Sequence, residues 1–199
     1  MVFETTFHNL ADSWTNNSIT LASNGALPAK DRGYYFNGIG STRMNFTNDF
    51  ALNLAFTVSA WINTGTATDR VIFSKDDNAT DPTTVFVFKI QSDDNLAVEI
   101  TTPGNFATRE TEAVTVSLGS DTWYFVAAGV RLNTDASTAE VRIYQQTDVA
   151  IHTTSSSYYY LDDATAYKAV VGAERTSDLS TYRNLFTGFV YGIWIENVY

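Results

Sequence analysis

The stretch F-T-V-S-A-W-I-N, Phe56 to Asn63, decides the fold because its apolar residues recur at every second position. Successive side chains of an extended chain point to opposite faces, so one face of this segment carries only apolar residues. Those residues are Phe56, Val58, Ala60 and Ile62. A period of two over this length predicts a β-strand that is buried on one face.

Short apolar runs of the same kind recur along the chain, each bounded by Gly, Asn, Asp, Ser or Thr. The segments between them, among them Thr102 to Glu112, are predicted as loops. No stretch has the spacing of an amphipathic helix, which disfavours parallel folds with crossover helices. The sequence therefore predicts an all-β fold of about nine to twelve strands in two antiparallel sheets packed face to face. The further runs are Val71 to Ser74, Val85 to Ile90, Leu96 to Ile100, Val114 to Leu118, Trp123 to Val130, Ala139 to Tyr144, Ala169 to Val171 and Phe189 to Ile195.

Length and composition predict a single globular domain over residues 1 to 199, since 44% of the residues are apolar and only 17% are charged. The formal net charge of -10 opposes binding to nucleic acid or to an anionic membrane surface. No apolar stretch approaches the roughly 20 residues of a membrane helix, so no membrane insertion is expected. The chain has no cysteine, which excludes a disulfide scaffold, a thiolate metal site and a cysteine nucleophile.

Several segments resemble, in order and spacing, the laminin-G-like, concanavalin A-like lectin and glucanase jelly-roll family. The resemblance implies a two-sheet antiparallel jelly-roll sandwich, with a frequent Ca²⁺ at the loop rim. The cysteine pair that many laminin-G-like domains carry near their end is absent here. The segments are G-Y-Y-F-N-G-I-G (Gly33 to Gly40), F-T-V-S-A-W-I-N (Phe56 to Asn63), V-I-F-S-K (Val71 to Lys75), T-W-Y-F-V-A (Thr122 to Ala127), A-E-V-R-I-Y (Ala139 to Tyr144) and F-T-G-F-V-Y-G-I-W-I (Phe186 to Ile195).

The resemblance implies binding of glycans or of surface proteins, and we interpret the chain as a non-catalytic, lectin-like binding module, foremost for carbohydrate. Such a module belongs outside the cell or on its surface, although the first ten residues lack the basic start and apolar centre of a signal peptide. Two alternatives stay open: a glycoside hydrolase or polysaccharide lyase of the same fold, and an assembly domain of a surface layer or virus-like particle. The sequence carries no indication of oligomeric state.

The carboxylates argue against the enzyme alternative. Glycoside hydrolysis needs two carboxylates close together, and the E-x-D-x-E signature of the superfamily's hydrolases is absent. Glu99, Glu140 and Glu196 are isolated in the sequence and are predicted to be solvated strand positions. The histidines, His8 and His152, lie in no recognisable motif. We therefore expect no catalytic residue.

The segment K-D-D-N-A-T-D, Lys75 to Asp81, follows a predicted strand and is rich in oxygen ligands. Ca²⁺ binds six to eight oxygens from carboxylates, amides and carbonyls, so Asp76, Asp77, Asn78 and Asp81 form a candidate Ca²⁺ site. The spacing is not that of an EF-hand. The alternative is a polar hairpin turn in which the Asp and Asn side chains bond to their own backbone.

The candidate ligand-binding residues lie in two polar segments near the C-terminal end of the chain. The run of three tyrosines must expose at least one ring, and the later segment offers charged and hydroxyl groups for hydrogen bonds. The alternatives are a strand with Tyr159 facing inward and a plain solvated loop. The candidates are Tyr158, Tyr160, Arg175, Asp178 and Tyr182.

The tryptophans of the strand motifs could either contact a ligand or pack within the protein. Trp61 falls on the face opposite the apolar one, where a sugar ring can stack against it. A tryptophan at this place of the family motif commonly packs, however, so we predict that Trp61 lies in the core or just beneath the surface. Trp123 and Trp194 are likewise predicted to pack.

We predict that Ca²⁺ raises the melting temperature and that chelator lowers it, because an ion that binds only the native state stabilises it by about 2.7 kcal/mol at a hundredfold excess over its dissociation constant. The Asp76→Ala/Asp77→Ala double variant should lose this response in differential scanning fluorimetry. A melting curve that does not change at millimolar Ca²⁺ would leave the segment as a turn.

Overall fold

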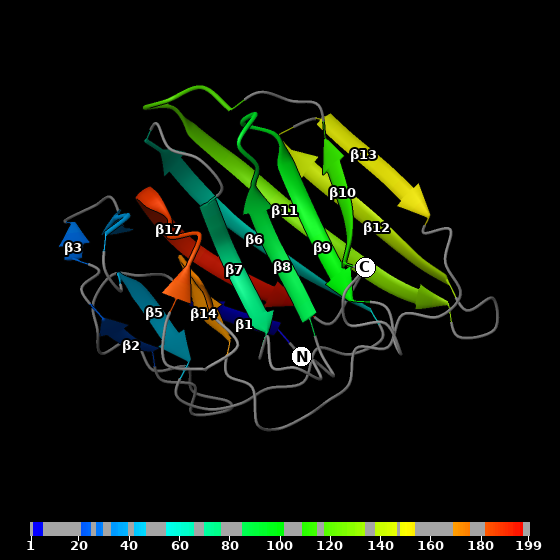
Figure 1. Cartoon of the computed structure of the whole chain (residues 1–199), viewed down its shortest axis with the longest axis horizontal. Coiled ribbons are helices and arrows are strands. Elements are labelled where there is room, and N and C mark those ends of the chain that lie inside the picture. Colours follow the sequence, from blue (N-terminus) through cyan, green and yellow to red (C-terminus); the bar gives the residue numbers. More distant parts are fainter. Residues whose placement is uncertain are drawn as a thin grey trace.

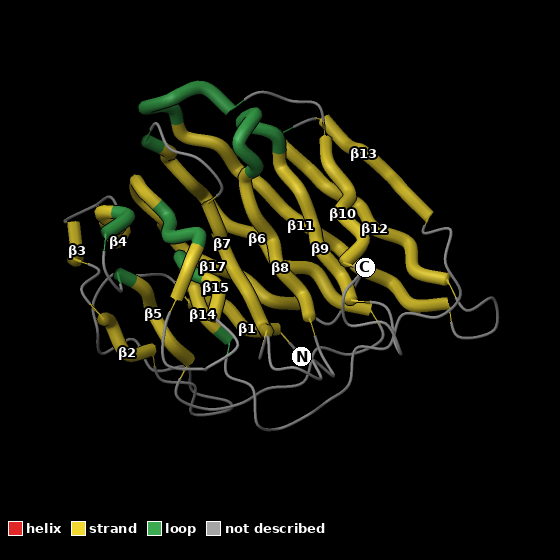
Figure 2. Tube along the Cα trace, in the orientation of Figure 1, coloured by secondary structure: helices red, strands yellow, loops and turns green. Residues whose placement is uncertain are grey.

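All regular structure in the described part of the computed structural model is β (Figures 1 and 2). The described residues form seventeen strands and no helix, which confirms the all-β prediction. They therefore include no helix able to cross a membrane. The described residues are 2–5, 21–24, 27–29, 33–39, 42–46, 55–65, 70–76, 85–101, 109–114, 118–133, 138–146, 148–153, 169–175 and 182–196.

Sheet A has eight strands in the order β13-β12-β11-β6-β17-β4-β3, with β1 also paired to β17. All of its pairs are antiparallel. Its strands are β1 (Val2–Thr5), β3 (Leu27–Ala29), β4 (Gly33–Asn37), β6 (Ala55–Thr64), β11 (Trp123–Asn133), β12 (Thr138–Gln145), β13 (Asp148–Thr153) and β17 (Thr187–Glu196).

Sheet B has seven strands in the order β10-β9-β8-β7-β14-β5-β2, and it lies in front of sheet A in Figure 1. A separate two-stranded ribbon pairs β15 with β16. The strands of sheet B are β2 (Leu21–Asn24), β5 (Arg43–Phe46), β7 (Arg70–Asp76), β8 (Val85–Ile90), β9 (Leu96–Thr101), β10 (Arg109–Val114) and β14 (Val170–Val171), and the ribbon strands are β15 (Glu174–Arg175) and β16 (Tyr182–Arg183).

The deciding stretch Phe56 to Asn63 lies inside β6, between β11 and β17 at the centre of sheet A. Burial alternates along it as the period of two predicts, with Phe56, Val58, Ala60 and Ile62 fully buried. These four side chains face sheet B and form part of one continuous core. The expectation of two packed antiparallel sheets is therefore confirmed.

Phenylalanine rings connect the two sheets across the core. Phe56 of β6 meets Phe86 of β8 edge to face, with ring centroids 4.9 Å apart. Phe86 also contacts Phe73 of β7 at 6.1 Å, and Phe73 contacts Phe46 of β5 at 6.2 Å. Each fully buried ring contributes about 1.5–3 kcal/mol of transfer free energy, so this chain of rings is a main source of the sandwich's stability.

The second face of sheet B is buried as well. Val71 and Val87 have no exposed surface there and form a small cluster of their own. Beside them Lys89 and Glu99, each 9% exposed, form an ion pair. The prediction that Glu99 is a solvated strand position is therefore wrong, because this face of its sheet is covered and its charge is balanced by the facing lysine.

The seventeen strands of the described residues exceed the nine to twelve predicted, because β1, β2, β3, β4, β5, β13, β15 and β16 fall in no predicted run. Among the strands that were predicted, the bounds are wrong at β10. Val114 ends this strand rather than beginning one, and most of the strand falls in the predicted loop Thr102 to Glu112. The segment R-E-T-E-A-V lacks apolar alternation because β10 is the edge of sheet B, with β9 as its one partner among the described strands. Edge strands carry charged residues that protect them from further pairing, so the composition of β10 looks like that of a loop.

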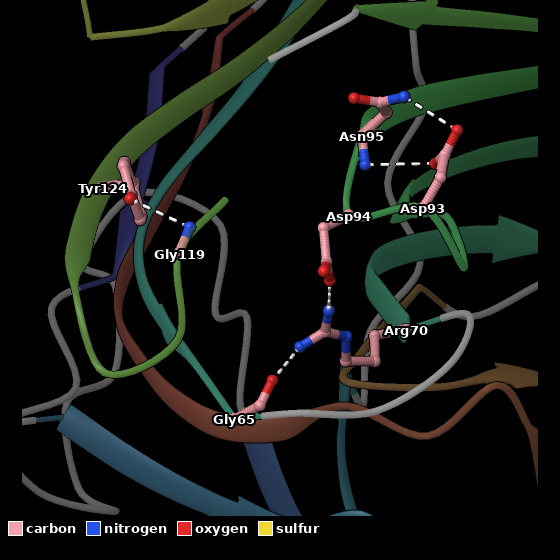
Figure 3. Close-up of polar contacts among 7 residues, drawn as sticks. All are labelled: Gly65, Arg70, Asp93, Asp94, Asn95, Gly119 and Tyr124. Atoms are coloured by element: carbon pink, nitrogen blue, oxygen red, sulfur yellow. Dashed lines mark hydrogen bonds and ion pairs between the residues drawn. The ribbon is translucent and has the colours of Figure 1, made fainter. Parts of the chain in front are cut away.

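Arg70 connects the two sheets at one rim of the sandwich (Figure 3). Its side chain has no exposed surface, and its guanidinium donates to the carbonyl of Gly65, directly after β6 of sheet A. The other guanidinium nitrogen contacts Oδ1 of Asp94, in the turn between β8 and β9 of sheet B, at 2.5 Å. Burial lowers the pKa of Arg70 and the Asp94 carboxylate opposes that change, so the arginine stays charged at neutral pH.

Backbone bonds attach the next loop to the same rim. The N–H of Leu118 donates to the carbonyl of Asp94, and the N–H of Asp121 donates to the carbonyl of Thr64. The N–H of Gly119 donates to the Tyr124 hydroxyl at 3.0 Å (Figure 3). The rim is therefore a single hydrogen-bonded unit that includes both sheets.

We predict that Asp94→Ala destabilises the fold by about 1–3 kcal/mol, because it leaves the buried guanidinium without its anionic partner. Urea unfolding measures the change. The exposed neighbour Ser92, mutated to alanine, is the control and should stay within about 0.5 kcal/mol of the parent protein. Equal stability of both variants would show that Arg70 does not need the carboxylate.

Candidate functional site

The outward face of sheet A is lined by aromatic side chains. Phe125 of β11, Trp61 of β6 and Tyr191 of β17 are register partners and form one row across three strands. The next row along the strands runs from Trp123 through Asn63 and Phe189 to Tyr35 of β4. We call this surface the aromatic face, and it comprises Tyr35, Trp61, Trp123, Phe125, Phe189, Tyr191 and Trp194.

The rings of the aromatic face contact one another. The centroids of Trp61 and Phe125 are 5.5 Å apart, and those of Tyr35 and Phe189 are 5.0 Å apart. Trp123 and Phe189 approach to 6.3 Å although Asn63 lies between them in the ladder. The ring planes within these pairs are tilted by 39 to 58° to each other, so the rings do not form a flat surface.

Trp61 and Tyr35 are the most exposed rings, with 40% and 37% of their surface accessible. Trp123 and Trp194 are half-buried on the same face. The prediction that Trp61 lies in the core or just beneath the surface is therefore wrong. Its position opposite the apolar face of β6 decides its direction, and two fifths of its surface stays accessible.

A β-bulge at Gly192 keeps the rings of β17 on one side. The pairing of β17 with β6 shifts between Tyr191 and Ile193, so Ile193 points into the core and Trp194 points outward again. Gly192 has φ of +66°, and a Cβ added there would lie 2.5 Å from the ring of Trp194. Only glycine combines this left-handed backbone with an indole lying against it.

Polar groups between the rings have no partner inside the described structure. The side chains of Asn63 and Ser59, which flank Trp61 along β6, make no hydrogen bond to any described residue. The same holds for the indole N–H of Trp61 and the hydroxyl of Tyr35. These groups are partly exposed, so they are available to a ligand that has hydroxyls of its own.

The charges farther along this face are paired with each other. Glu140 of β12 accepts from Arg142 at 2.8 and 3.1 Å. Arg131 of β11 is the register partner of Glu140. Glu140 is partly exposed and ion-paired, so the expectation of an isolated, solvated carboxylate holds only in part.

The structure brings together two of the candidate ligand residues. Arg175 and Tyr182 are register partners in the β15–β16 ribbon, and the guanidinium of Arg43 lies 3.6 Å above the Tyr182 ring. Next to them the buried Glu174 accepts from Arg183 at 2.7 Å and from Asn184 at 3.0 Å. Tyr158, Tyr160 and Asp178 lie outside the described residues.

The candidate Ca²⁺ residues start at the end of β7. Asp76 is the last residue of that strand and the register partner of Val85. Asp77, Asn78 and Asp81 lie outside the described residues. Within the described ranges no three acidic or histidine side chains gather as metal ligands would.

Sequence reasoning missed the aromatic face although a signal for it exists. The stretches Trp123 to Phe125 and Phe189 to Tyr191 place aromatic residues at alternate positions, and Trp61 and Trp194 lie in the strand motifs as well. Each stretch alone is compatible with packing. Only the pairing of β11, β6 and β17 shows that their outward positions meet on one face.

Solved structures share this fold at low sequence identity. Domain 4 of AbnA, an extracellular arabinanase from Geobacillus stearothermophilus in complex with arabinotriose, has a TM-score of 0.64 and 14% identity, covering 98% of this chain and 91% of that one. The IT-sialidase CBM40 of Ruminococcus gnavus bound to α2,3-sialyllactose has a TM-score of 0.60 and 11% identity, covering 81% and 89%.

The mouse laminin α1 chain, domains LG4-5, has a TM-score of 0.57 and 16% identity, covering 81% of this chain and 40% of that one. No protein-family model matches the sequence, and no curated protein sequence matches it significantly. The likeness establishes the fold class, a two-sheet jelly-roll sandwich.

We predict that Gly192→Ala destabilises the protein by about 1–2 kcal/mol or more, because alanine resists the left-handed backbone and its methyl meets the Trp194 ring. Urea unfolding gives the stability, and near-ultraviolet circular dichroism reports the displaced indole. Ser120→Ala is the control, since Ser120 is exposed and lies away from the bulge. An unchanged dichroism spectrum for Gly192→Ala would contradict the role of the bulge.

Proposed function

We propose that this protein is a non-catalytic, laminin-G-like carbohydrate-binding module that binds glycan on its aromatic face. The exposure of Trp61, 40% in the centre of a field of rings, is the observation that carries the proposal. The fold supports it, because the similar structures include a CBM40 bound to sialyllactose and an arabinanase domain in complex with arabinotriose.

A sugar ring matches the two kinds of group on this face. Its C–H face packs on an aromatic ring, and its hydroxyls exchange hydrogen bonds with side chains at the rim of the ring. Trp61 offers the ring, and Asn63 and Ser59 offer unpaired polar groups two residues away on either side. A purely apolar ligand would leave these polar groups desolvated and unpaired, which costs free energy.

The charges support a neutral sugar over an anionic one. The net charge of -10 opposes an acidic glycan, and Arg142 is already paired with Glu140. An acidic sugar recognised on this face would have to compete with that carboxylate. We therefore infer that the preferred glycan has no carboxylate or sulfate.

The carboxylates support binding without cleavage. Glu99 is paired with Lys89, Glu140 with Arg142 and Glu174 with Arg183. A glycosidase needs a protonated and an ionised carboxyl group on either side of the scissile bond, and each of these three is held by its own cation. The proposal therefore assigns no catalytic residue.

Two further parts of the proposal come from the sequence. Ca²⁺ held by Asp76, Asp77, Asn78 and Asp81 would stabilise the loop after β7, and Arg175 and Tyr182 of the ribbon, with Tyr158, Tyr160 and Asp178, would supply additional contacts. The module would act outside the cell or on its surface, where glycans are displayed, and a glycan-bearing surface protein would serve as its partner.

We predict that a panel of soluble polysaccharides retards the protein in affinity gel electrophoresis, and that Trp61→Ala weakens the tightest interaction about fivefold, since a stacking ring contributes on the order of 1 kcal/mol. Ile39→Ala is the matched control, because Ile39 is 74% exposed and lies outside the aromatic face. The Arg175→Ala/Tyr182→Ala variant tests the ribbon separately.

If Trp61→Ala binds glycan as the parent protein does and the ribbon variant does not bind, the glycan site lies at the ribbon rather than on the aromatic face. Absence of binding to every glycan would refute the proposed function. Release of reducing ends or of unsaturated products that absorb in the ultraviolet, abolished by one carboxylate substitution, would show instead that the protein is an enzyme.

A further inference from the structure

The strand β13, Asp148–Thr153, is an edge of sheet A among the described strands. It pairs with β12 on one side, and none of its residues has a hydrogen-bond partner on the other side within the described part of the chain. Its outward apolar side chains are among the most exposed of the protein, with Val149 at 49% and Ile151 at 59%. Such an edge is a template for a further strand.

Three of the usual protections of an edge strand are missing from the sequence and pairing of β13. The sequence D-V-A-I-H-T contains no proline and no lysine. The pairing of β13 with β12 is regular over its whole length, so no bulge turns the edge away. The edge strand of sheet B on the same side of the sandwich, β10, lies close to β13 and has the charged sequence R-E-T-E-A-V.

We propose that β13 pairs antiparallel with β13 of a second copy of this chain, joining the two sheets A into one continuous sheet. The sequence around Ala150 is self-complementary for such a pair. With Ala150 on the two-fold axis, Val149 lies opposite Ile151 of the second copy, and Asp148 lies opposite His152 of the second copy. Each of these pairs occurs twice by symmetry.

This register favours a second copy over an unrelated strand. Val149 and Ile151 form apolar cross-strand pairs in both directions, and such pairs stabilise a sheet. A two-fold interface of this kind closes after two copies, because it uses the same patch on each. The net charge of -10 on each chain opposes association, so the dimer should strengthen as salt screens it.

The dimer does not depend on the proposed function, but it has a consequence for it. Antiparallel pairing across a two-fold axis keeps the outward faces of both sheets on the same side. Seven strand intervals separate Trp61 from Trp61 of the second copy, which at about 4.8 Å each gives roughly 34 Å. One dimer would then present two aromatic faces to one glycan surface.

Sedimentation velocity of the parent protein over a micromolar to submillimolar range tests the proposal. We expect a concentration-dependent dimer, and Ile151→Lys should raise its dissociation constant at least about tenfold, since each change acts twice in the interface. Ile39→Lys is the matched control, with the same exchange at an apolar residue that is 74% exposed in another part of the fold, and it should dimerise like the parent.

A cysteine at the two-fold axis gives a second readout. The chain has no cysteine of its own, so Ala150→Cys introduces a single thiol. Directly opposed residues of an antiparallel pair have Cα atoms about 4.5–5.5 Å apart, which is within disulfide range. Oxidation should therefore link Ala150→Cys into a covalent dimer and leave Ile39→Cys uncoupled. The proposal is overturned if the parent protein is monomeric at every concentration. It is also overturned if the dimer persists in the Ile151→Lys variant and the Ala150→Cys variant forms no disulfide-linked dimer.

Discussion

The buried guanidinium of Arg70 is the constraint on which the rim of the sandwich depends. Arg70 is the first residue of β7. Its guanidinium contacts the carbonyl of Gly65, directly after the central strand β6 of sheet A, and the carboxylate of Asp94, in the β8–β9 turn of sheet B. A charge without exposed surface is tolerated only with partners, so both turns must adopt the conformation that supplies them. The loop before β11 attaches to the same two turns through its backbone, and the first outward aromatic position of β11, Trp123, follows directly. The position of that end of the aromatic face is thus connected to a buried ion pair.

The outer faces of the two sheets differ in character. The outer face of sheet B is covered, and it neutralises its charge internally through Lys89 and Glu99. The outer face of sheet A remains open around Trp61, with polar groups between its rings. The sandwich thus has one covered outer face and one open aromatic face, and the bulge at Gly192 adds one more indole to the aromatic face. The proposed glycan site would therefore be a surface of rings and hydrogen-bonding groups rather than a deep pocket.

The fold could be predicted from Phe56 to Asn63 and the similar runs because a strand buried on one face must alternate. The edge strand β10 was missed, since an edge carries charges that a pattern of apolar residues does not register. The direction of Trp61 also followed from alternation, yet its exposure did not, because exposure depends on what neighbouring strands and loops cover. The aromatic face arises only when β11, β6 and β17 are placed in register, which is information about pairing rather than about any single segment. Arg175 and Tyr182, chosen from one polar segment, are register partners in the ribbon, and their role as ligand contacts stays a prediction.

The pairing of the first strand with the last decides how this domain responds to tension. Val2 of β1 lies opposite Glu196 of β17, and the two strands run antiparallel from there. Force applied to both ends of the chain therefore acts perpendicular to these strands and breaks the hydrogen bonds between β1 and β17 one after another. In shear geometry the same bonds would bear the force together. β1 would separate first and at low force, exposing the edge of β17 from Ile193 to Glu196 while the rest of sheet A stays paired. A domain carried between two anchored surfaces would in this way lengthen by one short strand before its core is strained.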